Sequence, residues 1–80
     1  MPYISPDDKC SVARDGPQTA GELNYLITTN VLRYLHGAPK LSYAEINAVI
    51  GVLECAKMEF YRRLAAPYED TKIRENGDVY

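Results

Sequence analysis

The strongest structural signal in the chain lies in residues 41–65, which read LSYAEINAVIGVLECAKMEFYRRLA. Ser42 and Glu45 have the spacing of a capping box, in which the two side chains can satisfy free amides of the first helical turn. Leu41 and Ile46 flank this box at the positions of a hydrophobic staple. The sequence therefore predicts a helix that begins next to Ser42.

The body of this helix has an apolar stripe whose members recur at three- and four-residue steps, as in an amphipathic helix. The stripe comprises Ile46, Val49, Ile50, Leu53, Ala56, Phe60 and Leu64. Pro67 follows, and a proline disfavours helical conformation at the residue before it. We expect the helix to span about 43–65 and this stripe to face the core.

A second apolar face runs along the same helix and comprises Ala44, Ala48, Gly51, Val52 and Cys55. A helix that is apolar on two sides is normally buried on two sides. Gly51 costs about 1 kcal/mol relative to alanine in a helix interior, and close approach of another backbone would explain it. We expect this face to be a homo-oligomer interface, with coverage by the N-terminal arm of the same chain as the alternative.

Residues 19–36 predict another helix of the same chain, which would pack against the helix at about 43–65. Thr19 and Glu22 form another capping box, in which Thr19 can bond the Glu22 amide and the Glu22 side chain can reach the Thr19 amide. Gly37 is expected to be a left-handed cap, and Pro39 to prevent continuation. The helix should span about 20–36, with an apolar stripe that comprises Leu23, Leu26, Ile27, Val31, Tyr34 and Leu35.

The connection between the two helices is short, which predicts an antiparallel helical hairpin of about 20–36 and 43–65. A Ser-Pro-Asp-Asp sequence predicts a short N-terminal helix near 6–14. After Pro67, acidic residues precede basic ones up to an Asn-Gly pair, which predicts one or two C-terminal helical turns. The expected fold is all-α, with residues 1–80 forming a single small domain.

Composition limits the possible functions. The chain has 80 residues, a formal net charge of −2 and no run of basic residues, so we expect no binding to DNA. No signal peptide pattern and no membrane-length apolar segment is visible, which predicts a cytoplasmic protein without membrane contact. Cys10 and Cys55 lie far apart in sequence, so neither a disulfide framework nor a zinc site is expected.

The sequence also lacks the pattern of an enzyme. Its one histidine, His36, falls at a helix C-terminus, where a cation is favoured without any catalytic role. Glu54 and Glu59 are five residues apart, a spacing unlike the paired carboxylates by which helical nucleotide pyrophosphohydrolases bind magnesium. No glycine-rich phosphate loop is present. We therefore expect no catalytic residues, no metal and no cofactor.

One polar stripe is a candidate ligand site. Tyr25, Thr29, Arg33 and His36 follow one another at steps of four, four and three residues, which places them in one column on the helix. A stacking ring, a hydroxyl, a guanidinium and an imidazole are groups that hold a nucleotide or a phosphate. The alternative is an ordinary solvated helix face.

Several segments resemble a family of small phage and prophage proteins of uncharacterised function. They read GELNYLIT at 21–28, NAVIGVLECAK at 47–57, EFYRR at 59–63, APYED at 66–70 and ENGDVY at 75–80, and the start MPYI is also similar. The resemblance covers nearly the whole chain. It implies a phage-type origin and supplies no catalytic residues.

These observations together predict a non-enzymatic, homo-oligomeric, phage-type binding protein that acts in the host cytoplasm. One specific version is sequestration of a small nucleotide immune signal of the host at a subunit interface. The alternative is a protein–protein modulator that binds a host enzyme or a phage assembly component. It would use the tyrosine-rich surface, since seven of the eight aromatic residues are tyrosines, and the C-terminal tail.

Overall fold

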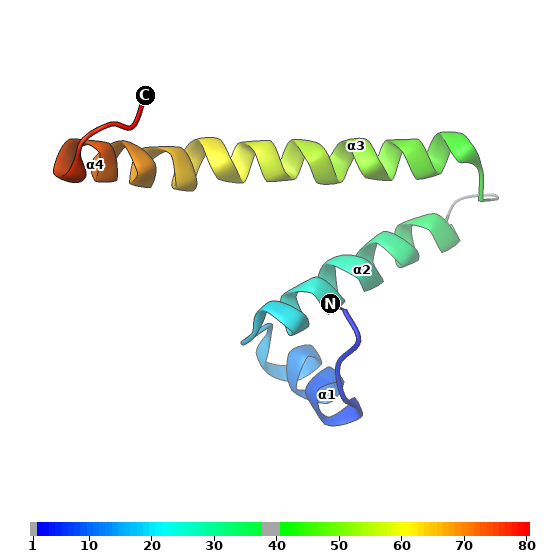
Figure 1. The fold of residues 1–80 in the computed structure, drawn as a ribbon. Helices are drawn as coiled ribbons and strands as arrows, with labels where there is room; N and C mark the ends of the chain where they lie inside the picture. The colour runs from blue at the N-terminus through cyan, green and yellow to red at the C-terminus, as the bar shows by residue number, and fades with distance from the viewer. Residues whose placement is uncertain (1, 38–40) are drawn as a thin grey trace. The chain divides into compact units, whose positions relative to one another are not determined.

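The computed structural model describes residues 2–37 and 41–80, and these residues form helices without any strand (Figure 1). The elements are α1 (Pro6–Asp15), α2 (Ala20–Gly37), α3 (Tyr43–Phe60), the π-helical turn η1 (Tyr61–Ala65) and α4 (Ala66–Asn76). The predicted all-α class is confirmed. No helix in the described part of the chain has the length and apolar character needed to cross a bilayer.

Internal contacts divide the chain into two compact units, Met1–Glu45 and Ile46–Tyr80. The first unit holds α1, α2 and the first residues of α3, and the second holds the rest of α3, η1, α4 and the C-terminal tail. Packing of α2 against α3 as a hairpin stays a prediction, as does the single domain.

The N-terminal helix α1 confirms the helix predicted near 6–14 and extends it by one residue. Ser5 is its N-cap, because the Asp8 amide donates to the Ser5 hydroxyl over 3.1 Å. Gly16 ends the helix with a φ of 82°, a conformation that glycine adopts without steric cost. Val12 is 3% exposed where α1 packs on α2, and it is the core of the first unit.

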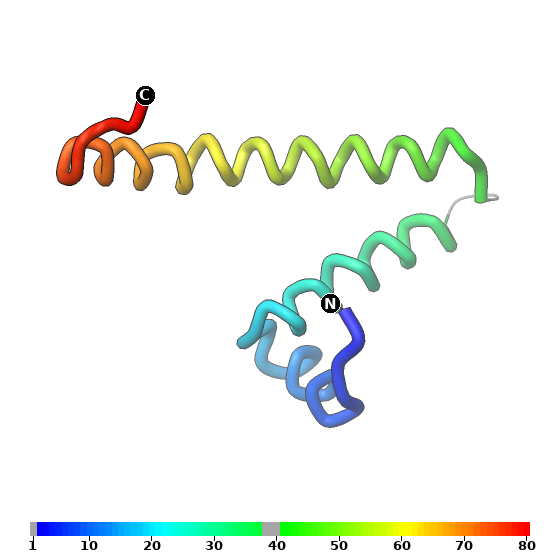
Figure 2. The backbone as a smooth tube through the Cα atoms, viewed as in Figure 1, coloured from blue at the N-terminus to red at the C-terminus, as the bar shows by residue number. Residues whose placement is uncertain are grey.

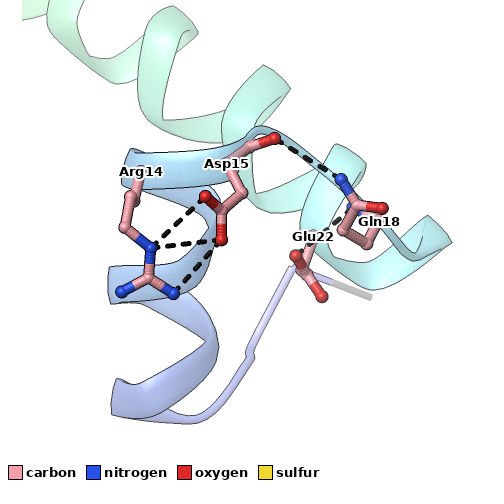
Figure 3. Close-up of polar contacts among 4 residues, drawn as sticks. All are labelled: Arg14, Asp15, Gln18 and Glu22. Carbon is pink, nitrogen blue, oxygen red and sulfur yellow. Dashed lines mark hydrogen bonds and ion pairs between the residues drawn. The ribbon is translucent and has the colours of Figure 1, made fainter.

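The capping box of α2 forms, but one of its two predicted hydrogen bonds has a different donor. The Glu22 amide donates to the Thr19 hydroxyl over 3.1 Å, as predicted. The Glu22 carboxylate accepts from the amide of Gln18 rather than from that of Thr19 (Figure 3). It also accepts from the Thr19 hydroxyl. These bonds satisfy a carboxylate whose residue is only 6% exposed, and they tie the start of α2 to the segment after α1.

The C-terminal end of α2 differs from the prediction. Gly37 is the last helical residue and not a left-handed cap, since among the described residues only Gly16 and Gly77 have positive φ. A left-handed glycine is one of several ways to satisfy the last carbonyl groups of a helix, and boundaries vary by a residue. The expected effect of Pro39 lies outside the described residues.

The start of α3 is also capped as predicted, but with a different second bond. The Glu45 amide donates to the Ser42 hydroxyl over 3.2 Å. The Glu45 carboxylate does not return to the capping residue and instead accepts from the Tyr34 hydroxyl of α2 at 2.8 Å. This bond raises the pKa of Tyr34, because the carboxylate favours the protonated phenol.

The predicted end of this helix at residue 65 was wrong, because helical structure continues through Pro67 to Asn76 (Figure 2). In an α-helix the proline ring clashes with the carbonyl four residues earlier, and its missing amide leaves that carbonyl unpaired. Here the Ala66 amide bonds to the Tyr61 carbonyl, five residues earlier, and the widened turn accommodates the proline. Gly77, with a φ of 89°, ends α4.

No residue of α3, η1 or α4 is buried. Leu53 is 41% exposed and Phe60 is 64% exposed, so the predicted burial of their stripe is not observed. The second unit is one continuous helix with a short tail, and a single helix cannot cover its own sides. Its apolar side chains therefore need a covering surface from elsewhere.

The capping box of α2 can be tested by Thr19→Ala. This change removes the hydroxyl that accepts from the Glu22 amide and donates to the Glu22 carboxylate, so the free energy of unfolding should fall by about 1 kcal/mol. Chemical denaturation monitored by circular dichroism measures it. Thr28→Ala, a matched change inside the same helix, should cost less, and equal losses in the two variants would contradict the capping role.

Candidate functional site

The predicted ligand stripe lies entirely on α2, but its members differ in exposure. Tyr25 and Thr29 are half-buried, whereas Arg33 and His36 are exposed. The structure thus places the four residues on one helix as predicted. We call the half-buried pair, Tyr25 and Thr29, the inner half of the stripe. The exposed pair toward the end of α2, Arg33 and His36, is its outer half.

Two members of the stripe already have partners within the first unit. The Lys9 ammonium of α1 lies 5.8 Å from the centroid of the Tyr25 ring, within the range of a cation–π interaction. The Thr29 hydroxyl donates to the Leu26 carbonyl of its own helix over 3.1 Å. A ligand that stacks on Tyr25 would lie beside Lys9 or displace it, and one that bonds Thr29 would compete with the helix backbone.

The outer half of the stripe is the part most accessible to an anion. Arg33 forms no ion pair with any other residue that the structure describes. Its guanidinium can therefore offer two parallel N–H groups to a phosphate. Sequence reasoning missed Lys9 as a cation beside Tyr25, because only the packing of α1 on α2 brings the two residues together.

The predicted assembly face lies along α3, and all its members are exposed, namely Ala44, Ala48, Gly51, Val52 and Cys55. Val52 is 67% exposed and Cys55 is a free thiol. Within the second unit, apart from its chain neighbours and the adjacent backbone of its own helix, no atom lies within 4 Å of the place where a Cβ would stand on Gly51. Packing inside the described chain therefore does not require a glycine at this position, although glycine weakens the helix there.

A charged cluster adjoins this face at the C-terminal end of α3. Glu59 accepts hydrogen bonds from both Arg63 and Arg62, which lie four and three residues further along the same helical segment. The two guanidinium groups, Arg63 first, lower the pKa of the Glu59 carboxyl. A shallow surface depression here is lined by Glu54, Cys55, Lys57, Met58, Glu59, Tyr61 and Arg62.

Tyrosines gather on the C-terminal part of the same helix. The nearby Glu69 carboxylate raises the pKa of the Tyr61 phenol, because it favours the protonated form. Tyr68 is 64% exposed, with the Lys72 ammonium 5.6 Å from its ring centroid. A second depression lies between α4 and the tail, lined by Glu69, Lys72, Ile73, Asn76, Gly77, Asp78, Val79 and Tyr80. This is the tyrosine-rich surface that the alternative function would use.

Metal-binding side chains do not converge in the part of the chain that the structure covers. No group of three or more His, Cys, Asp or Glu residues lies within metal-binding distance there. Cys10 and Cys55 are both exposed free thiols. The arrangement offers non-covalent contacts, namely cations, hydroxyls and apolar helix faces.

Comparison with known proteins yields one match. The family model described as a domain of unknown function (DUF6899) matches residues 1–79. No curated protein and no solved structure matches the chain significantly. The match supports the expected uncharacterised family over nearly the full length, and it assigns no role to any residue.

The ion-pair cluster can be tested through the pKa of Glu59. In the wild type this pKa should lie below that of an ordinary glutamate, and Arg63→Gln should raise it, because Arg63 is the larger cause of the shift. A carboxyl whose pKa is lowered by folding stabilises the protein above the unfolded-state pKa. That contribution is lost as the pH falls through the folded-state pKa.

Carbon-13 NMR titration of the side-chain carboxyl measures both values. Lys72→Gln removes a positive charge that pairs with Glu75, and it should leave the Glu59 titration unchanged. The same Glu59 pKa in the wild type and in Arg63→Gln would show that the ion pair does not persist in solution.

Proposed function

The chain belongs to the DUF6899 family, and we propose that this member is a non-enzymatic, homo-oligomeric binding protein. The observation that carries the proposal is the second unit, a continuous helix without a buried residue and with apolar side chains on two sides. Such a helix is stable in water when other surfaces cover it, which makes association part of how the protein works.

A second copy of the chain is the proposed cover for the face that contains Gly51 and Val52. The predicted hairpin with α2 would cover the stripe of Ile46 and Leu53 and would leave this second face outside. Burying one apolar side chain such as Val52 contributes about 1.5–3 kcal/mol, so a helix-long face supplies substantial association energy. The small side chains of the face allow the close approach of another helix.

The ligand of the assembled protein is proposed to be a small anion of the nucleotide class. Arg33 and His36 are exposed on the outer half of the α2 stripe, and Lys9 adds a cation beside the Tyr25 ring. These groups can bind phosphate and a base without any chemical step. In the phage context that the sequence resemblance implies, the ligand would be a host immune signal held in the host cytoplasm.

A second candidate function is supported by the tyrosines of the second unit. Tyr61, Tyr68 and Tyr80 are all exposed, and tyrosine supplies rigid contact area at low entropic cost. The depression between α4 and the tail adds a concave feature beside them. These observations favour a protein–protein modulator whose partner, a host enzyme or a phage assembly component, binds α4 and the tail.

Assembly can be tested by Gly51→Leu and Val52→Arg. Light scattering should report more than one subunit for the wild type and a smaller species for both variants, because each disturbs the proposed contact. Gly51→Leu should keep or raise the helix content, since leucine favours helix and no atom of the second unit beyond the adjacent helix backbone and the chain neighbours lies near the new Cβ.

Asn30→Arg serves as the control, because it adds the same charge at an exposed site on α2 and should leave the subunit number unchanged. A wild-type protein that is monomeric at high micromolar concentration would refute the assembly proposal.

Ligand binding can be tested first by a thermal-shift panel of cyclic and linear nucleotides. A ligand at about one hundred times its Kd should add about 2.7 kcal/mol to the free energy of unfolding. For any nucleotide that binds, Arg33→Lys should weaken the affinity by about 1–3 kcal/mol with little change in Tm, because lysine cannot form two parallel bonds to phosphate.

Calorimetric titration with that nucleotide measures the affinity. Arg14→Lys is the matched control, since Arg14 pairs with Asp15 outside the stripe. Equal affinity in the wild type, Arg33→Lys and Arg33→Ala would remove the stripe from the site, and a flat nucleotide panel would favour the protein-partner function.

A further inference from the structure

The second face of α3 continues beyond its small residues as a seven-residue repeat. Its positions follow one another at alternating steps of four and three residues, which is the spacing of a coiled-coil seam. The seam comprises Ala44, Ala48, Gly51, Cys55, Met58 and Arg62, and every one of these residues is exposed. Met58, at 60% exposure, is the largest apolar side chain among them.

We propose that two copies of the chain pair through this seam in antiparallel orientation, with Gly51 of each copy facing Cys55 of the other. The inference rests on the proposed homo-oligomer and adds its contact surface, orientation and register. The occupant of this exposed helix face is thus α3 of a second copy.

Side-chain size favours this register. An antiparallel pair centred near Leu53 places Gly51 against Cys55, and Ala48 against Met58, so each small residue faces a larger one. A parallel pair would place Gly51 against Gly51 and Met58 against Met58, which leaves a gap in one layer and crowds another. Interiors pack best when small and large residues interdigitate.

Gly51 supports the same contact independently. A glycine weakens a helix interior, and within the second unit no atom outside the adjacent helix backbone and the chain neighbours comes near the position that its missing Cβ would occupy. In the proposed pair, the Cys55 side chain of the other copy packs over that position. The glycine is then explained by the close approach of the two helices.

Charge complementarity selects the antiparallel orientation. Glu59 is paired with both Arg62 and Arg63, so this cluster carries one surplus positive charge. The antiparallel register brings Ala44 of the other copy opposite Arg62, and the neighbouring Glu45 can offset that surplus. Glu45 already accepts from Tyr34 on one oxygen, and a carboxylate accepts several donors. A parallel pair would instead set Arg62 against Arg62.

The antiparallel register predicts which pairs of introduced cysteines can form a disulfide between two copies. Two cysteines form a disulfide only when their Cα atoms lie within about 7 Å. With a rise of 1.5 Å per residue, residue 48 of one copy lies roughly 15 Å along the axis from residue 48 of an antiparallel partner. The same holds for residue 58, whereas residues 48 and 58 face each other.

The experiment uses full-length chains in which Cys10→Ser and Cys55→Ala remove the native thiols. One chain carries Ala48→Cys and the other carries Met58→Cys, and each is oxidised alone and after mixing. The expected result is a disulfide-linked heterodimer in the mixture, identified by mass, with at least tenfold less cross-linking of either chain alone. A Lys72→Cys chain mixed with the Ala48→Cys chain gives the background from random collisions.

Each other outcome overturns the inference in a recognisable way. Efficient cross-linking of Ala48→Cys alone would establish a parallel pair, which rejects the register and retains the homo-oligomer. Background cross-linking in every mixture, with light scattering that still reports an oligomer, would place the contact elsewhere. A monomer by light scattering would reject both the register and the proposed assembly.

Discussion

The two apolar sides of α3 set the constraint on which the rest of the structure depends, because a single helix can bury neither of them by itself. The first unit solves the same problem locally, since α1 packs on α2 and buries Val12. In the second unit, α3, η1 and α4 follow one another as one continuous helix, and none of their residues is buried. Under the proposed assembly, a surface outside the unit stabilises this segment, so its folding is coupled to its association.

The sequence predicted the helix starts well because capping is local. Thr19 and Ser42 receive the predicted amide bonds, which depend only on residues three positions apart. The bonds from the glutamate side chains back to the capping residues were predicted less well. Glu22 accepts from Gln18 and Glu45 accepts from Tyr34, because a long side chain can reach several donors. The end at Pro67 was missed because a π turn leaves no distinctive sequence pattern.

The candidate site was likewise predictable from local sequence only in part. Helical periodicity was enough to place Arg33 and His36 on one exposed face and to place Gly51 on another. Periodicity could not show that Lys9 lies over the Tyr25 ring, because this contact depends on how two separate helices, α1 and α2, pack on each other. Periodicity also could not predict that the Thr29 hydroxyl donates to the Leu26 carbonyl of its own helix. Water or a ligand would have to replace this bond in order to accept from the hydroxyl.

The π turn η1 lies between the proposed assembly face of α3 and the tyrosine-bearing surface of α4. An inserted residue in a helix rotates everything that follows relative to what precedes. Arg62 belongs to the charged cluster with Glu59 at the end of the proposed seam, while the Glu69 carboxylate of α4 raises the pKa of Tyr61. The helix thus changes the face that it presents where the seam ends. In the proposed assembly, one continuous element would hold a second copy through α3 and leave Tyr68 of α4 exposed for the proposed protein partner.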